Sequence, residues 1–208
     1  LKGGVMAKWN RRLLQTILPR SARHSIYRRR LELPSSWPSS LVFKIADNPA
    51  ELEQAFSLLH DSYVAAGFMD PSKSGLRVTP HHLLPTTTTL VGLSKGRVVA
   101  TCALVRDSVL GLPMDSIFEL TRFRESGERI AEVSSLAIAP EFRFNGGPFL
   151  HSFIRFLWRY SLFYHGTNRF LIAVNPSMRE LYESIYLFQP ATDACEIDRY
   201  DFVKGAPA

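Results

Sequence analysis

The apolar residues of this chain follow two spacings from residue 41 onward, one typical of strands and one typical of helices. Short runs rich in β-branched and apolar residues predict strands over residues 41–46, 86–93, 98–105, 130–139 and 170–174. The tail over residues 196–203 alternates like an edge strand. Lys95 and Gly96 separate the second and third runs, which predicts a hairpin.

The helical spacing is clearest after Asn48, where Pro49 occupies the first helical position and Glu51 can reach back to the cap. The apolar face of this helix consists of Leu52, Phe56, Leu59 and Tyr63. Further helices are predicted over about residues 116–123, 149–165 and 178–186. Strands and helices in this order predict an α/β fold with a mixed sheet.

Residues 68–85 are polar and rich in turn formers, so they predict a long loop. Ordered loops of this length often serve as lids or binding loops. No internal repeat is present in the chain.

The charge of the chain is concentrated in its first 40 residues, which hold nine Lys or Arg and one acid, whereas residues 41–208 hold sixteen and eighteen. We therefore predict a basic N-terminal arm over residues 1–40, ending in the Pro/Ser linker Leu33–Ser40, and one domain over residues 41–208. The arm allows two short helices, broken at Pro19. It is either a solvated segment packed loosely on the body or a docking surface for an acidic partner.

Composition excludes several classes of protein. The near-neutral body argues against nucleic-acid binding, and no apolar stretch approaches the ~18 residues of a membrane span. With only Cys102 and Cys195, a disulfide scaffold is not implied, and a reducing, cytoplasmic location is expected. Cys102 lies in an apolar run and is interpreted as a core residue rather than a nucleophile.

The stretch AEVSSLAIAPEFRFNGG, residues 131–147, joins a predicted strand to a predicted helix through an arginine and two glycines. Glycines at such a junction allow backbone N–H groups to face a phosphate-bearing ligand. A plain tight turn would explain the same residues. Glu132 lies on the preceding strand, which suggests an acyl group on a phosphate-bearing carrier held beside a base.

At this point the chain resembles the GCN5-related acyltransferase superfamily, whose phosphate loop reads Arg/Gln-x-x-Gly-x-Gly/Ala. Arg143, Gly146 and Gly147 lie in or beside that pattern, and Pro148 occupies its last small position. The superfamily's later Asn…Tyr…Gly-Phe pattern matches Asn175 and Tyr182, with Leu187-Phe188 and one extra residue at its end. The resemblance implies a mostly antiparallel central sheet flanked by helices.

A closer resemblance covers residues 41–208. The strings HDSYVAAGFMD, SGLRVTPHHLLPTTTTLVG, LVRDSVLGLPMDSIF, AEVSSLAIAP, IAVNP and RYDFVKGAPA are similar to long-chain N-acyl amino acid synthases of the N-acyl tyrosine synthase type. That family is related to acyl-homoserine lactone synthases, which carry a Glu-x-Ser-Arg string. The matching residues of this chain, 132–135, read Glu-Val-Ser-Ser, so Ser135 replaces the arginine. The missing arginine argues against a homoserine lactone product.

The resemblance implies transfer of a fatty acyl group from an acyl carrier protein thioester to the α-amine of an amino acid, plausibly tyrosine. The donor would be the carrier's phosphopantetheine, and no tightly bound cofactor is expected. Because Pro148 lacks an N–H, coenzyme A is the weaker candidate, although an acyl-CoA-dependent transferase acting on another amine stays open. A non-catalytic acyl-binding or membrane-surface module, using the basic arm, is an alternative of another class.

The reaction requires a base, because the amine arrives as an ammonium ion. Glu132 is the candidate, and its alternative interpretation is a structural carboxylate paired with an arginine. Tyr182 could protonate the leaving thiolate, or it could be a core residue of an amphipathic helix. Direct attack by the amine is favoured because no Ser-His-Asp or Cys-His arrangement can be argued.

The donor needs backbone N–H groups for the pantetheine amides and the tetrahedral intermediate, and these are expected on the strand and loop before the third helix. The candidates for donor binding are Ser135, Leu136, Ile138, Phe142, Arg143, Phe144, Asn145, Gly146 and Gly147, with Asn175 downstream. Arg77 and Arg106 are the candidates for binding the amino acid's carboxylate.

Phe153, Phe156 and Leu157 could line a slot for the acyl chain, although aromatic helix faces are more often plain core. The six histidines show no metal-ligand spacing, so no catalytic metal is expected.

Overall fold

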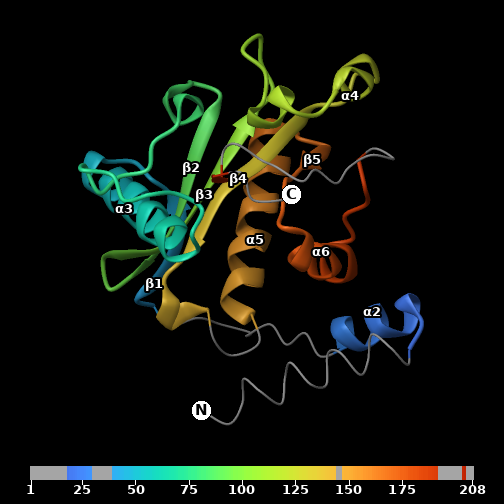
Figure 1. Ribbon diagram of the computed structural model, residues 1–208, viewed down its shortest axis with the longest axis horizontal. Helices are drawn as coiled ribbons and strands as arrows, with labels where there is room; N and C mark the ends of the chain where they lie inside the picture. The colour runs from blue at the N-terminus through green and yellow to red at the C-terminus, as the bar shows by residue number, and fades with distance from the viewer. Residues whose placement is uncertain (1–17, 30–38, 144–146, 192–202, 205–208) are drawn as a thin grey trace.

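The computed structural model describes residues 18–29, 39–143, 147–191 and 203–204 (Figure 1). Its centre is a five-stranded sheet in the order β1 (Leu41–Ile45), β2 (Thr87–Ser94), β3 (Arg97–Arg106), β4 (Ile130–Ile138) and β5 (Arg169–Leu171). All neighbours are antiparallel except β4 and β5, which are parallel. The prediction of a mixed, mostly antiparallel sheet flanked by helices is therefore confirmed.

Two helices cover the two faces of the sheet, because adjacent residues of a strand point to opposite sides. Leu90 packs in one buried cluster with Phe153 and Leu157 of α5 (Pro148–Tyr160), whereas Val91 packs in another with Ala55 of α3 (Pro49–Ala65). The sheet thus lies between α3 and α5 (Figure 1).

The face of the sheet that holds α3 is completed by the segment between β3 and β4. This segment contains the 3₁₀ turn η2 (Pro113–Ser116) and the short helix α4 (Thr121–Glu125), and Met114 and Phe123 pack there with Ala103 and Val105. The short helix predicted over residues 116–123 therefore starts later than expected, at Thr121, because Pro113 begins a 3₁₀ turn that occupies residues 113–116.

The start of α3 follows the predicted cap. The Asn48 side chain accepts a hydrogen bond from the Glu51 N–H at 3.0 Å, and Glu51 accepts one from the Asp47 N–H at 3.2 Å. Reciprocal bonds of this kind satisfy N–H groups that have no partner inside the helix.

Other boundaries differ from the sequence-based predictions. Helix α5 ends at Tyr160 and continues as the π-helical turn η4 (Ser161–His165), while the last helix divides into η5 (Pro176–Met178) and α6 (Arg179–Ile185). The loop over residues 68–85 contains the 3₁₀ turn η1 (Pro80–Leu83). The predicted edge strand over 196–203 lies outside the described residues, apart from Val203.

Part of the basic arm forms a helix that contacts the body. Helix α2 (Arg20–Arg29) lies beneath α6 (Figure 1), with Arg20 paired to Glu183 and Arg23 paired to Glu180 at 2.8 Å. In the described part of the chain, no helix is long and apolar enough to span a membrane.

Gly147 caps α5 with a φ of +88°, and a Cβ at that position would lie 2.9 Å from His151 Nε2. Gly75 also has a positive φ, +65°, but a Cβ there would meet nothing within 4 Å. We expect Gly75→Ala to lower the free energy of unfolding by about 1 kcal/mol, because an L-residue is strained in this region. Gly147→Ala should cost more, since His151 must also move. Urea unfolding measures both variants, and equal losses would contradict the close approach of His151.

Candidate functional site

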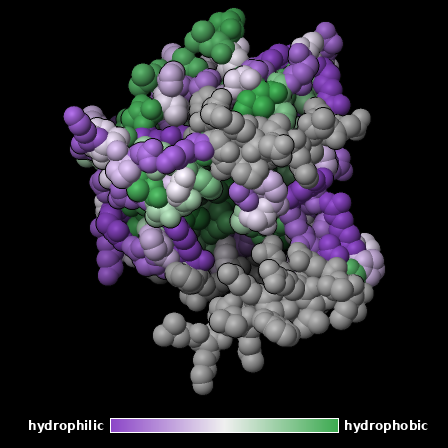
Figure 2. All heavy atoms as spheres, in the orientation of Figure 1, coloured by the Kyte–Doolittle hydropathy of each residue, from purple (hydrophilic) through white to green (hydrophobic). Residues whose placement is uncertain are grey.

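A cavity of about 480 Å³ lies where α3, β4, α5 and α6 meet. Figure 2 shows the molecule hollowed at this place, with apolar residues at the floor. Its walls include Tyr63 and Arg77 on the α3 side and Leu157 and Trp158 on the α5 side. Since α3 and α5 lie on opposite faces, the cavity passes through the sheet.

The passage exists because β4 and β5 pair over only three residues each, ending at Glu132 and Leu171. Beyond this point, Val133 to Leu136 on one side and Ile172 to Val174 on the other line the cavity. Among the described residues, this edge of β4 has no further strand partner. Its backbone polar groups can therefore bind an extended ligand.

A β-bulge marks the middle of this open edge. Between the pairs Thr101–Ala137 and Ala103–Ser134, two residues of β4 oppose the single residue Cys102 of β3. One of them, Ser135, has a φ of +54°. A bulge leaves a backbone group outside the ladder, and both Ser135 and Leu136 line the cavity.

Glu132 lies at the point where the two strands part, with a side chain that is 1% exposed and contributes to the cavity wall. Its Oε2 accepts a hydrogen bond from the Met114 N–H at 2.9 Å. Burial raises the pKa of Glu132 to about 8, the Met114 hydrogen bond opposes this, and nearby Asp115 adds to it. No ion pair to Glu132 forms within the described residues, so the interpretation as a carboxylate paired with arginine finds no support there.

The Met114 N–H is held in place by a cluster of charged side chains on the outside of η2. Arg124 binds Asp107 at 2.8 Å and Asp115 at 2.5 Å, and Asp115 also accepts from the Leu112 N–H at 2.6 Å. These bonds hold the turn that presents its backbone to Glu132.

The two arginines expected to bind a carboxylate are placed differently. Arg77 lines the cavity, with its guanidinium 4.4 Å from the centre of the Tyr63 ring. Arg106 does not line it, because its guanidinium donates to the carbonyls of Thr86 and Pro85, each at 3.2 Å.

Two tyrosines near the end of α6 face the cavity. Burial raises the pKa of Tyr182 to about 12, and it also raises the pKa of Tyr186. The Tyr186 hydroxyl lies 2.5 Å from Nδ1 of His151, a buried residue in the first turns of α5.

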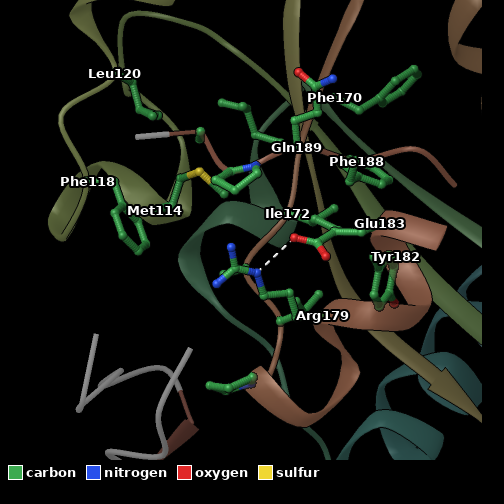
Figure 3. A pocket seen from close by; sticks show the side chains of 16 residues that line it. Met114, Phe118, Leu120, Phe170, Ile172, Arg179, Tyr182, Glu183, Phe188 and Gln189 are labelled. Carbon is green, nitrogen blue, oxygen red and sulfur yellow. Dashed lines mark hydrogen bonds and ion pairs between the residues drawn. The ribbon is translucent and has the colours of Figure 1, made fainter. Parts of the chain in front are cut away.

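A smaller hollow of about 130 Å³ adjoins the cavity and shares Ile172, Tyr182 and Phe188 with it. Figure 3 shows Met114 and Phe118 on one side of this hollow and α6 on the other. Its walls are mostly apolar. Its polar side chains are those of Tyr182, Gln189, Arg179 and Glu183, and the last two form an ion pair with an N–O distance of 2.8 Å, drawn as a dashed line in Figure 3.

The structure brings only some of the predicted donor-binding residues to the cavity. Ser135, Leu136 and Asn175 line it, and the Asn175 side chain caps η5 by accepting from the Ser177 N–H at 3.0 Å. Ile138 and Phe142 instead pack in the core against α5.

The loop that leads to α5 is described at its two ends. Arg143 donates from Nε to the Ile138 carbonyl at 2.6 Å, which ties the loop to the end of β4, and Gly147 begins the helix. Phe144, Asn145 and Gly146 lie outside the described residues.

The predicted acyl-chain residues also divide. Leu157 lines the cavity, whereas Phe153 and Phe156 pack on Phe43, with ring centres 5.6 and 6.2 Å apart. These two rings therefore belong to the hydrophobic core, which was the alternative to an acyl-chain slot for this helix face. The described residues contain no group of three or more His, Cys, Asp or Glu that could hold a metal ion.

Sequence reasoning missed several residues of the site. The Met114 N–H carries no side-chain signal, and Tyr63 was assigned only to a helix face. His151 and Tyr186 are 35 positions apart, and no spacing in the sequence connects them.

Comparisons with known proteins relate the chain to acyltransferases. A scan of protein families matches residues 54–208 to the family described as N-acyl amino acid synthase FeeM. The solved structure of FeeM, an N-acyl amino acid synthase from uncultured soil microbes, has a TM-score of 0.59 and 27% identity over 69% of this chain and 76% of that one.

Two other structures share the fold at lower identity. The AHL synthase LasI has a TM-score of 0.53 and 15% identity, over 69% of this chain and 77% of its own. ElaA from Escherichia coli has a TM-score of 0.55 and 11% identity, over 77% of this chain and 93% of its own. No match was found among curated proteins.

The raised pKa of Glu132 has a consequence for stability. The folded protein binds this proton more tightly than the unfolded chain, whose glutamate has the ordinary value of 4.5. Proton binding by Glu132 therefore contributes to the free energy of unfolding. The contribution is complete at a pH below 4.5, the pKa in the unfolded chain, and it is lost as the pH rises through about 8, the pKa in the folded protein. Glu132→Gln, which cannot ionise, should therefore become more stable relative to the wild type between about pH 5 and about pH 9, by a few kcal/mol in order of magnitude. Urea unfolding at both pH values measures this, and a constant difference would contradict the burial of an unpaired carboxyl.

Proposed function

Because the chain belongs to the FeeM family of N-acyl amino acid synthases, we propose that it transfers a long-chain acyl group from a carrier-protein thioester to the α-amine of an amino acid, with tyrosine as the acceptor. One observation supports this most: a buried carboxyl, Glu132, lies beside the opening between two strands. The amine and the thioester would meet there.

Glu132 has the properties of a base for an ammonium substrate. A pKa of about 8 lies close to that of an α-amine, so a proton can pass between them at little cost in free energy. The Met114 N–H holds one carboxylate oxygen, which leaves the other for the substrate.

The acceptor would bind on the α3 side of the cavity. Arg77 offers a guanidinium for the amino acid's carboxylate. Tyr63 and Phe68, whose ring centres are 5.8 Å apart, offer aromatic surface for a tyrosine side chain.

The donor would bind along the open edge of β4. The pantetheine amides would pair with the backbone of Val133 to Leu136, and the bulge at Ser135 would supply an N–H to the tetrahedral intermediate. One such donor is typically worth ~3 kcal/mol in the transition state.

The fatty chain requires apolar surface, since each buried methylene gains about 0.8 kcal/mol. The wall formed by Ile154, Leu157 and Trp158 provides it, and the adjoining hollow beside Phe118 and Phe170 extends it.

A carrier protein as donor is supported by two features. Pro148 at the start of α5 removes one N–H that would otherwise bind the phosphates of a nucleotide carrier. Arg28 and Arg29 at the end of α2 are exposed, and they offer positive charge to an acidic carrier.

The proposal is tested by incubating the purified chain with tyrosine and either palmitoyl carrier protein or palmitoyl-CoA. Mass spectrometry should find N-palmitoyl tyrosine with the carrier protein as the better donor. Faster turnover of the CoA thioester would overturn the choice of donor, and an acylated amine other than an amino acid would overturn the acceptor class.

Glu132→Gln should lower kcat by about a hundredfold or more, because general-base catalysis is worth that much. The wild-type kcat should rise with pH and level off above about 8, since the carboxylate must be ionised to accept a proton. The variant should lose this rise, whereas Glu132→Asp, the control, should keep it at a lower rate. A Gln variant with the wild-type profile would remove Glu132 from the mechanism.

Arg29→Glu should raise the KM for acyl carrier protein and weaken its dependence on salt, because it removes an attraction that salt screens. Turnover of a small pantetheine thioester should not change. Arg122→Glu is the matched control, since it reverses an exposed charge on α4, far from α2 in Figure 1. Equal effects of the two reversals would exclude α2 as the docking site.

A further inference from the structure

A buried hydrogen bond between His151 and Tyr186 connects the wall of the large cavity to the start of α5. Tyr186 follows the last residue of α6 and lines the cavity, and its hydroxyl lies 2.5 Å from Nδ1 of His151. The histidine is 6% exposed. A short, buried contact of this kind fixes the direction of the phenol O–H bond.

The second ring nitrogen of His151 faces the opposite way. Nε2 lies so close to Gly147 that a Cβ there would be 2.9 Å away. The imidazole therefore extends from the cavity wall to the turn that begins α5. Burial lowers the pKa of His151, so the ring is neutral near pH 7 and holds one proton.

We propose that Tyr186, oriented by His151, donates the proton that the thiolate takes up when the amide forms. This inference rests on the proposed function, because it concerns the leaving group of that reaction. His151 would be a positioning residue, and Tyr186 would be the group that touches sulfur.

The proton balance of the step is complete. Glu132 first takes a proton from the ammonium group and passes it to solvent. The amine nitrogen then bonds to the thioester carbon and gives a second proton to Glu132, while the carbon–sulfur bond breaks and sulfur takes the Tyr186 hydroxyl proton. His151 donates its Nδ1–H to the phenol oxygen, which directs the O–H into the cavity. That Nδ1 proton then replaces the one lost by the phenol, and Nε2 takes a proton from water. The second proton on Glu132 returns to solvent and neutralises the hydroxide left behind, and exchange with solvent moves the ring proton of His151 back to Nδ1.

Tyr182 is the alternative donor, because it matches the tyrosine of the superfamily pattern and also lines the cavity. Its neighbours are aromatic rings, with Tyr186 at 5.6 Å and Phe188 at 6.0 Å between ring centres. Within the described residues, no side chain forms a hydrogen bond with its hydroxyl. Among the described residues, no histidine is bonded to the Tyr182 hydroxyl in the way that His151 is bonded to that of Tyr186.

The test compares two acyl donors in single-turnover reactions of the full chain with tyrosine. A pantetheine thioester releases a basic alkyl thiolate, whereas an aryl thioester releases a weakly basic thiolate that leaves without a proton. Tyr186→Phe should slow the first reaction by about a hundredfold and the second hardly at all. His151→Gln should show the same dependence on the donor with a smaller loss.

Tyr160→Phe is the matched control. The Tyr160 hydroxyl makes a second bond of this type, to His165 Nε2 at 3.0 Å, and neither residue lines the large cavity or the adjoining hollow. This variant should react with both donors at the wild-type rate.

The proposal would be overturned if Tyr186→Phe lowered the single-turnover rate equally with both donors. A donor-dependent loss of rate in Tyr182→Phe would overturn it as well. If thermal unfolding shows that Tyr186→Phe does not fold, His151→Gln decides by the same criterion. A wild type that makes no N-acyl amino acid from either donor would refute the proposed function instead.

Discussion

The short pairing between β4 and β5 is the constraint on which the site depends. Three pairs of residues join the strands, and the sheet then opens to form a cavity that reaches both of its faces. Backbone groups buried without partners are costly, so an opening of this kind persists only where a ligand or water satisfies them. The bulge at Ser135 bends the same strand at the opening, while the rest of β4 stays paired to β3. A continuous sheet at this place would leave no room for the cavity.

The proposed chemistry of the site depends on the position of Glu132, at the point where the two strands separate. Burial makes the ionised form of this carboxyl unfavourable. The Met114 N–H, rather than a cation, partly offsets that cost by donating a hydrogen bond to it. The charged side chains that stabilise η2, Arg124 with Asp107 and Asp115, lie on the outer side of that turn. The turn is therefore rigid, yet the carboxyl keeps a pKa near that of its proposed substrate. A direct arginine partner would instead favour the ionised carboxylate and lower its pKa.

The basic arm contributes to the body as well as to the charge of the chain. Arg20 and Arg23 bind Glu183 and Glu180 on α6, the helix whose other residues line both cavities. A solvated arm and a docking surface were the two interpretations from sequence, and the ion pairs show that the part of the arm in α2 packs on the body. One part of its charge pairs with α6, and Arg28 and Arg29 at its end remain exposed.

The sequence alone determined the order of strands and helices, the cap of α3, the glycine at the start of α5 and the candidate base, because each depends on local spacing or on one residue's chemistry. Tertiary structure decided which of these residues share a cavity. Arg77 and Arg106 are equivalent as sequence, yet one faces the site and the other binds backbone carbonyls. Phe153 and Leu157 lie one turn apart on α5, and only Leu157 reaches the opening. The contact of His151 with Tyr186, and that of Glu132 with the Met114 backbone, join residues from separate elements. Such contacts arise only when the elements pack, so no periodicity along the chain encodes them.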